Sequence, residues 1–557
     1  MAATAGVIVW QNAHVAVLFD LSYILNTATR IALGQVPYRD FPLAHAPLTF
    51  LLQATIIGLT GRVYFHHVIY VAAVGGLSTL LSWRIVLRLL RGRVATAWTV
   101  GLLLSLPLTV VGIYCIVPNP EYDCDCGFWI LVALWMVMRL DAKSGAASGF
   151  AAGAALCVPI FFKQNMGLPL LLAAIGAVLL LLVVKWRWRR RDAATGPSTL
   201  ALFSILAGVC VTLAGAALAL HWTAGVGNYL HWTIEYAGQR RMPGFSPMGD
   251  VYRDPMLLWT LPCVVIALVV LRFAPAAFRW ARVAAFVLIA APFLFALASL
   301  FIYDDADERG DSLLALWPLL LVLAAALTMV NLFRLRRDKT LRAFLPLFLV
   351  AAILGTFMSQ QLWGSTYGIW PLLVLLVAEL LAFIDGRATP RWFVPGLAAI
   401  ISVTLLVCGG FYTASEERLS YAYLPDGPPA HSAFLQLAGL ATPGPYLAEI
   451  DELLRYAQAN IPLDDGIVLI PGEEPFYFAS DRVPRFPLPF FDPTIDPYSP
   501  EEVLSLVRSR NIHWLIVKRD VQTKEDPTPQ REELMKVLMG EFTLSSHLRG
   551  YDVYRRR

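Results

Sequence analysis

The chain has 557 residues, of which 57% are hydrophobic and 15% are charged, and its mean hydropathy is +0.61. A soluble globular protein carries about 25% charged residues, so this composition argues against a soluble enzyme. The net charge is +4, and the basic residues stand in short clusters between apolar runs. This charge pattern is typical of membrane topology and argues against nucleic-acid binding.

Apolar runs near the length of a bilayer span, roughly 20 residues, recur along the first three quarters of the chain. We predict thirteen spans, near residues 4–19, 62–82, 96–117, 122–140, 146–162, 167–184, 198–220, 255–271, 283–303, 312–332, 343–359, 367–384 and 392–413. The first run lacks the basic region and cleavage site of a signal peptide, so we expect it to be retained as an anchor. Splitting 146–184 into two spans keeps Lys163 out of the membrane interior, where a charge is costly.

Basic residues give the predicted spans an orientation. Clusters follow the even-numbered spans and contain Arg84, Arg88, Arg91, Arg93, Arg139, Lys143, the run KWRWRRR (185–191), Arg279, Arg282, the run RLRRDK (334–339), Arg387 and Arg391. By the positive-inside rule, the side that carries them is cytoplasmic. We therefore expect a cytoplasmic N-terminus, with residues 20–61 and everything after residue 413 outside the cytoplasm.

Residues 414–557 are richer in charge and proline than the preceding chain. PYLAEIDELLRYAQ (445–458) has helical spacing, and SPEEVLSLVRSR (499–510) begins as a helix does. GIVLI (466–470) and HWLIVK (513–518) are typical of buried strands. The predicted fold is mainly α: a polytopic membrane helix bundle, residues 1–413, followed by a small extracytoplasmic α/β domain, residues 414–557.

The first outer loop holds two short helices that are not expected to span the membrane. LSYILNTATRIAL (21–33) has one apolar face and stops at Gly34, and PLTFLLQATIIGL (47–59) begins with a proline. We expect both to lie in the plane of the interface as juxtamembrane helices. The segment between them, GQVPYRDFPLAHAP (34–47), is stiffened by Pro37 and Pro42.

These features resemble the GT-C superfamily of integral-membrane glycosyltransferases. The matching features are an acid directly after the first span, an amphipathic helix, the motif GQVPYRDF (34–41), and PLT before a second helix. The resemblance is closest to the branch with protein O-mannosyltransferases, the lipid A aminoarabinose transferase and the bacterial RgtA/B/C/D-like enzymes.

The resemblance implies transfer of a sugar from a polyprenyl-phosphate donor to a lipid, glycan or protein acceptor outside the cytoplasm, usually with inversion. It also implies a place in a bacterial inner or plasma membrane and a role in the cell envelope. No cofactor is implied, and a metal requirement stays open. A transporter or flippase for a lipid-linked substrate, and a non-catalytic envelope assembly factor, remain as alternatives.

The resemblance places the catalytic acid at Asp20. Many family members have a second acid directly afterwards, where this chain has Leu21, so a remote partner for Asp20 is sought in Asp40 or in PEYDCD (120–125). Asp20 could instead be a helix N-cap, and Asp40 could pair with a neighbouring arginine in the loop.

Other polar residues are candidates for binding substrate. Lys163 is expected at the outer surface, where it could hold the donor phosphate or reach lipid headgroups. Glu121, Asp123 and Asp125 could support the base or bind the acceptor, or could complement a helix dipole. A zinc site with Cys124 and Cys126 is not favoured, because the spacing is not one that zinc sites use. The remaining candidates are Tyr38, Arg39, His45, Arg240 and Arg241.

Overall fold

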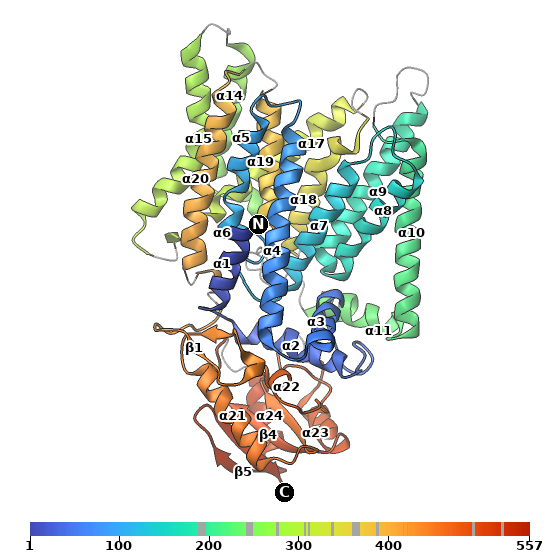
Figure 1. Ribbon diagram of the computed structural model, residues 1–557, viewed down its shortest axis with the longest axis vertical. Helices are drawn as coiled ribbons and strands as arrows, with labels where there is room; N and C mark the ends of the chain where they lie inside the picture. Colours follow the sequence, from blue (N-terminus) through green and yellow to red (C-terminus); the bar gives the residue numbers. More distant parts are fainter. Residues whose placement is uncertain are drawn as a thin grey trace.

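The computed structural model places a long helical bundle on top of a smaller C-terminal domain (Figure 1). It describes residues 1–187, 196–240, 249–274, 278–305, 308–309, 312–335, 339–358, 368–385, 389–415, 417–419, 421–492, 496–524 and 529–557. The helices of the first outer loop lie between the two parts (Figure 1). The predicted fold class, a mainly α helix bundle with a small C-terminal α/β domain, is confirmed; the boundary at residue 413 stays a prediction.

A helix occupies each predicted span. The bundle helices are α1 (Ala2–Asn12), α4 (Tyr64–Leu90), α5 (Ala97–Ser105) with α6 (Leu108–Val111), α7 (Tyr122–Met138), α8 (Ala146–Cys157), α9 (Gln164–Arg187), α10 (Thr199–Trp222), α14 (Leu257–Phe273), α15 (Arg279–Ile302), α17 (Trp317–Arg334), α18 (Leu345–Thr356), α19 (Trp370–Asp385) and α20 (Phe393–Ala414). Within the described residues, 6 helices are long and apolar enough to cross a membrane. The count of thirteen spans therefore remains a prediction.

The break between α8 and α9 falls where the sequence analysis divides residues 146–184. A short 3-10 turn, Val158–Phe161, follows α8, and α9 starts at Gln164. Lys163 consequently lies at a helix junction and not within a continuous span. The division into two helices is confirmed.

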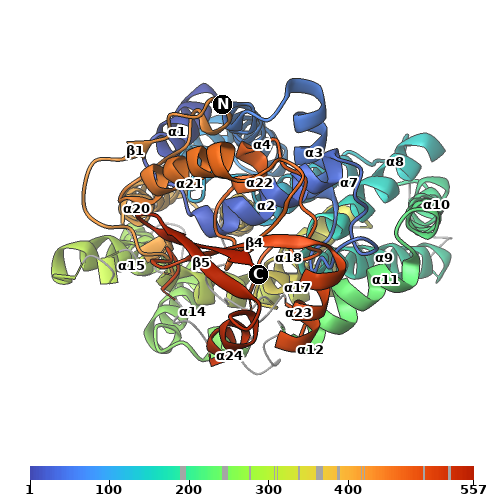
Figure 2. The same ribbon diagram turned by 90° about the horizontal axis from the view of Figure 1, so that it is seen from below.

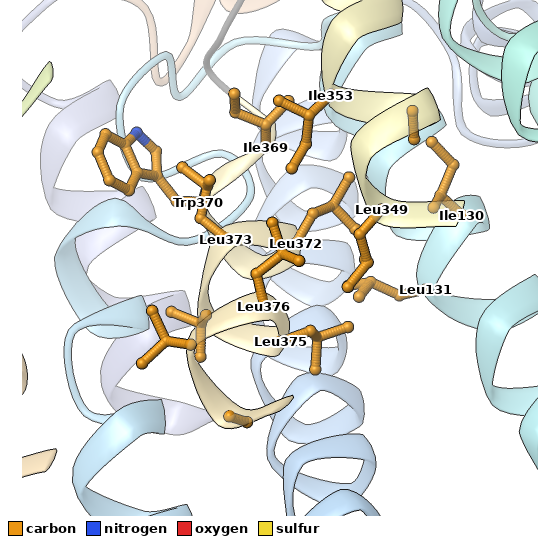
Figure 3. Packing of buried hydrophobic residues seen from close by; sticks show 14 of the residues in the cluster. Ile130, Leu131, Leu349, Ile353, Ile369, Trp370, Leu372, Leu373, Leu375 and Leu376 are labelled. Carbon is orange, nitrogen blue, oxygen red and sulfur yellow. The ribbon is translucent and has the colours of Figure 1, made fainter. Parts of the chain in front are cut away.

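The centre of the bundle is an apolar core around α19. Figure 3 shows Leu372 and Leu376 of α19 beside Leu349 of α18 and Leu131 of α7, and all four side chains are buried. Tight apolar packing of this kind resists displacement. The core therefore holds α7 in place beyond its first turn.

The first outer loop forms α2 (Leu18–Ala32) and α3 (Leu48–Thr60). Gly34, at a φ of +90°, follows α2 as predicted. The placement of α2 and α3 in the plane of the interface stays a prediction. The polar side chains of α2 do not face solvent, since Ser22, Asn26 and Arg30 are buried. These side chains instead donate hydrogen bonds to carbonyl groups of the C-terminal domain, at Gly472, Glu474 and Phe486.

The C-terminal domain contains the predicted helices and strands and a hairpin that was not predicted. Its elements are β1 (Ala430–His431), β2 (Ala441–Thr442), α21 (Tyr446–Asn460), β3 (Gly466–Ile470), α22 (Phe476–Ala479), α23 (Pro500–Ser509), β4 (Ile512–Lys518), α24 (Pro529–Leu538), β5 (Phe542–His547) and β6 (Tyr551–Arg556). The main sheet has the order β3-β4-β6-β5, with β3 and β4 parallel and the other pairs antiparallel. Seen from below, this domain lies across α2 (Figure 2).

Candidate active site

Asp20 lies in the first turn of α2. The N-cap of this helix is Val17, and no side chain caps it by a hydrogen bond. The interpretation of Asp20 as an N-cap is therefore wrong. The Asp20 carboxylate accepts a hydrogen bond from the hydroxyl of Tyr421, with 2.6 Å between Oη and Oδ2.

Glu121 lies close to Asp20 although 101 positions separate them in the sequence. Glu121 is the N-cap residue of α7 and is buried. Burial raises the pKa of Glu121 well above its ordinary value, and the negative charges of Asp20 and Asp123 raise it further, whereas Lys163 lowers it. Among the described contacts, Glu121 is thus a proposed remote partner whose pKa is raised by the charge of Asp20.

Lys163 and Asp123 form a buried ion pair between the start of α9 and the first turn of α7. Their side chains are 7% and 5% exposed. The Lys163 Nζ also lies 5.2 Å from the centre of the Tyr122 ring. An anion that binds Lys163 must therefore share the lysine with Asp123. If the anion displaced Asp123, the carboxylate would be left buried and unpaired, which is costly.

His45 joins this cluster from the first outer loop. Its ring lies 4.4 Å from the ring of Tyr122, and its Nδ1 is 3.0 Å from the hydroxyl of Tyr23 on α2. Tyr122 thus contacts both His45 and Lys163. The arrangement brings together α2, the first loop, the start of α7 and the residue before α9.

Asp125 faces a different set of partners. Its carboxylate accepts hydrogen bonds from the hydroxyls of Thr49, Tyr70 and Tyr114, each at 2.7 Å. These partners come from α3, from α4 and from the segment before α7. Asp125, which is buried, therefore holds α3 against the bundle, and its contacts favour a positioning role over substrate binding.

Arg39 and Asp40 pair with each other in the first outer loop, and Arg39 also donates to the carbonyl of Thr223, after α10, at 3.5 Å. The guanidinium of Arg39 lies 2.9 Å from Asp40 Oδ1, and the Val36 N–H donates to Asp40 Oδ2 at 2.7 Å. The hydrogen bond from Arg39 lowers the pKa of Asp40. These contacts favour the alternative in which Asp40 stabilises the loop.

Tyr38 is buried at the tip of the same loop, at a φ of +68°. Its hydroxyl donates to the carbonyl of His45 at 2.7 Å, and its ring meets that of Tyr229 edge-on at 5.2 Å. Tyr38 therefore shapes the loop that carries His45. Arg240 ends the short helix α12 (Ala237–Arg240); its side chain and the whole of Arg241 lie outside the described residues.

A segment that follows α10 also closes on the site. It comprises α11 (Val226–Leu230) and a π-helical turn, His231–Tyr236. The side-chain amide of Gln164 donates to the carbonyl of Thr233 at 3.1 Å and to that of Ala44 at 3.4 Å. The residue directly after Lys163 thus ties the start of α9 to both outer segments.

Two tyrosines of the site were not identified from the sequence. Tyr122 stands inside the acidic motif, between the candidates Glu121 and Asp123. This position is the sequence signal that could have identified it. Tyr421 reaches Asp20 across a sequence separation of 401 residues, and no local pattern marks it.

No family model matches the sequence, and no curated protein matches it. Among solved structures, ArnT from Cupriavidus metallidurans bound to undecaprenyl phosphate is similar, at 14% identity and a TM-score of 0.45, covering 99% of this chain and 96% of that chain. An oligosaccharyltransferase from Archaeoglobus fulgidus in the apo form is similar at 11% identity and a TM-score of 0.45, covering 90% of this chain and 66% of that chain.

Proposed function

We propose that this protein is a membrane glycosyltransferase of the GT-C type, which moves a sugar from a polyprenyl-phosphate donor to an acceptor hydroxyl outside the cytoplasm. The observation that carries the proposal is the cluster of Asp20, Glu121 and the Asp123–Lys163 pair, at the end of the bundle where the first-loop helices lie. The first outer loop, which carries the motif that resembles this superfamily, reaches the same cluster through His45, whose ring lies 4.4 Å from that of Tyr122.

The donor needs little activation in such a reaction. Phosphate is already a good leaving group, and a cation that holds its charge as the bond to the sugar breaks lowers the barrier. Lys163 is the residue proposed for this role. Its contact with the Tyr122 ring and its ion pair with Asp123 keep the ammonium group in place before substrate arrives.

The acceptor hydroxyl is a poor nucleophile at neutral pH and needs a base within hydrogen-bond reach. Asp20 is the residue proposed as this base. The raised pKa of Glu121 favours its neutral, protonated form. A neutral Glu121 beside an ionised Asp20 leaves one carboxylate able to accept the acceptor's proton, in place of two that repel each other.

The test uses purified protein in proteoliposomes with a polyprenyl-phosphate sugar and an envelope acceptor extract. Asp20→Asn keeps the size of the side chain and its ability to accept the hydrogen bond from Tyr421 but removes the base. We expect turnover to fall by roughly 10²–10⁴-fold, the usual contribution of a general base, while the melting temperature stays close to that of the wild type.

The matched control is Asp40→Asn, which changes the other first-loop aspartate. Its contacts lie within the loop, so we expect turnover within a few-fold of wild type. Near-native turnover of Asp20→Asn would contradict the proposed role of Asp20. Movement of the lipid-linked sugar across the bilayer without any transfer would instead indicate a flippase.

A further inference from the structure

The segment 520–524 of the C-terminal domain reaches the start of α2, where the proposed base lies. Gln522 is fully buried there. Its side-chain carbonyl accepts a hydrogen bond from the backbone N–H of Leu18 at 2.7 Å, and its amide donates to the carbonyl of Ala16 at 3.2 Å. The Gln522 side chain therefore binds the backbone on either side of Val17, the N-cap residue of α2.

Gln522 is itself fixed by a buried ion pair. The backbone N–H groups of Gln522 and Thr523 donate to the carboxylate of Glu473, at 2.9 Å and 3.1 Å. Glu473 in turn pairs with Lys518 at 2.9 Å, and both side chains are at most 1% exposed. Lys518 ends β4 and Glu473 follows β3, so the two parallel strands of the sheet set the position of Gln522.

The same segment also fixes the hydroxyl that reaches Asp20. Ala422 and Thr523 form an antiparallel bridge, and the N–H of Lys524 donates to the carbonyl of Tyr421 at 2.9 Å. Tyr421 is thus held by its backbone on the segment that carries Gln522. From this position its hydroxyl donates to Asp20 at 2.6 Å.

We propose that Tyr421 and Gln522 are positioning residues for Asp20, and that through them the C-terminal domain forms part of the active site. The proposal rests on the proposed function, in which Asp20 is the base. Gln522 sets the backbone from which Asp20 projects, and Tyr421 sets its carboxylate. A base must lie within about 0.5 Å of its productive position, and a helix turn fixed at backbone and side chain satisfies this requirement.

The contact from Tyr421 also has a chemical consequence. A hydroxyl that donates to a carboxylate favours the ionised form of that carboxylate. Loss of this hydroxyl should therefore move the acidic limb of the pH–rate profile to higher pH. Among the described residues, Glu121 is a titratable group that interacts with Asp20, and Asp123 and Lys163 in turn interact with Glu121. None of these residues is changed in the variants below.

The main test is Tyr421→Phe, assayed in proteoliposomes across pH together with its thermal stability. We expect kcat to fall roughly 10- to 100-fold, as for loss of a hydrogen bond to a charged group, with an unchanged donor KM and an acidic limb at higher pH. Tyr423→Phe is the matched control, because Tyr423 lies two residues after Tyr421 and is 56% exposed. It should leave both kcat and the acidic limb as in the wild type.

Gln522 is tested with two variants. Gln522→Ala removes both hydrogen bonds to the start of α2 and should lower kcat. Gln522→Met keeps most of the side-chain volume but removes the same hydrogen bonds, so kcat should fall as far as in Gln522→Ala. A wild-type kcat in Gln522→Met would contradict the role of Gln522.

The outcomes separate this inference from the function on which it rests. If Asp20→Asn is inactive while Tyr421→Phe keeps the wild-type rate and acidic limb, the positioning role is overturned and the proposed function stands. If kcat of Tyr421→Phe falls without a shift of the acidic limb, Tyr421 is only structural and the proposal is also overturned. If Asp20→Asn keeps near-native turnover, the role of Asp20 as the base fails, and this inference fails with it. If the wild-type protein transfers no sugar, the proposed function itself fails.

Discussion

The ion pair between Lys163 and Asp123 gives the lysine two possible purposes. It could neutralise a buried carboxylate, or it could hold the phosphate of a donor. Both side chains are almost completely buried, so removing either partner leaves a charge without compensation. A single substitution therefore mixes a loss of stability with a loss of binding.

A double variant separates these two purposes. Lys163→Ala alone should cost about 3–5 kcal/mol in unfolding free energy because it leaves Asp123 unpaired. Lys163→Met combined with Asp123→Asn removes both charges and should restore most of that stability. If Lys163 holds the donor phosphate, the apparent KM for the donor stays high in the double variant. A double variant with wild-type donor KM would show that the lysine serves Asp123 alone.

Glu121 predicts a dependence of stability on pH. Burial raises its pKa in the folded protein well above the ordinary value of 4.5, so the folded state binds a proton that the unfolded state has released. The stabilising contribution is complete below the ordinary pKa and is lost as pH rises from about 4.5 towards the raised pKa.

Glu121→Gln should remove this loss, since glutamine stays neutral. Thermal melts in lipid nanodiscs between pH 5 and 9 should show the variant gaining stability relative to wild type as pH increases. Glu533→Gln, at an exposed position on α24, is the control and should follow the wild-type curve. Parallel curves for Glu121→Gln and wild type would rule out this account of Glu121.

At the scale of elements, α8 and α10 pack so closely that two glycines of α8 leave no room for a side chain. A Cβ at Gly149 would meet the carbonyl oxygen of Ala201, and one at Gly153 would meet that of Ile205. Small residues at such positions allow membrane helices to approach each other. Because α8 leads directly into the turn before Lys163, its packing also affects the site.

Gly153→Ala should therefore destabilise the protein by about 1–3 kcal/mol, as overpacking does, and should also raise the donor KM. Gly176→Ala on α9 is the matched control, because a Cβ there has no neighbour within 4 Å. Melting temperature and donor KM, measured together, check both effects. If the two alanine variants melt alike, α8 and α10 are not as closely packed as the structure indicates.

The helices could be predicted because their signal is local. Apolar length, Gly34 and Pro47 placed most bundle helices and the helices of the first loop close to their observed bounds. The first span was predicted too long: it ran to residue 19, whereas α1 ends at Asn12 and α2 already begins at Leu18. The β5–β6 hairpin was missed, since most β5 side chains are exposed and its apolar alternation covers only four residues, FTLS (542–545). The buried polar face of α2 was also missed, because its partners lie more than 400 positions away, as Gly472 does from Ser22.

In the candidate site, too, the residues with a local sequence signal could be predicted and the contacts between distant residues could not. Asp20 was identified through the family resemblance of the first outer loop, Lys163 because a charge beside apolar runs needs an explanation, and Glu121 because it begins an acidic motif. Sequence spacing could not rank Glu121 above Asp40 as the partner of Asp20. That ranking depends on how α7 approaches α2, which is a property of the tertiary fold.

At the scale of the whole molecule, the site and the C-terminal domain lie at one end of the bundle (Figure 1). The described basic residues of the predicted cytoplasmic clusters lie at helix ends away from the site. For example, Arg91 follows the end of α4, and Lys143 lies between the end of α7 and the start of α8. By the positive-inside rule, the end with the site is expected outside the cytoplasm. A polyprenyl-phosphate sugar in the outer leaflet would then meet the first-loop helices directly.

Single cysteines test this orientation. Leu463→Cys places a thiol at a position in the C-terminal domain that is 65% exposed, and Lys143→Cys places one on the exposed loop between α7 and α8. In intact cells, a maleimide that cannot cross membranes should label Leu463→Cys and should label Lys143→Cys only after permeabilisation. The unsubstituted protein, with its 7 native cysteines, sets the background. Labelling of Lys143→Cys alone in intact cells would invert the topology and place the candidate site on the cytoplasmic side, where a donor in the outer leaflet could not reach it.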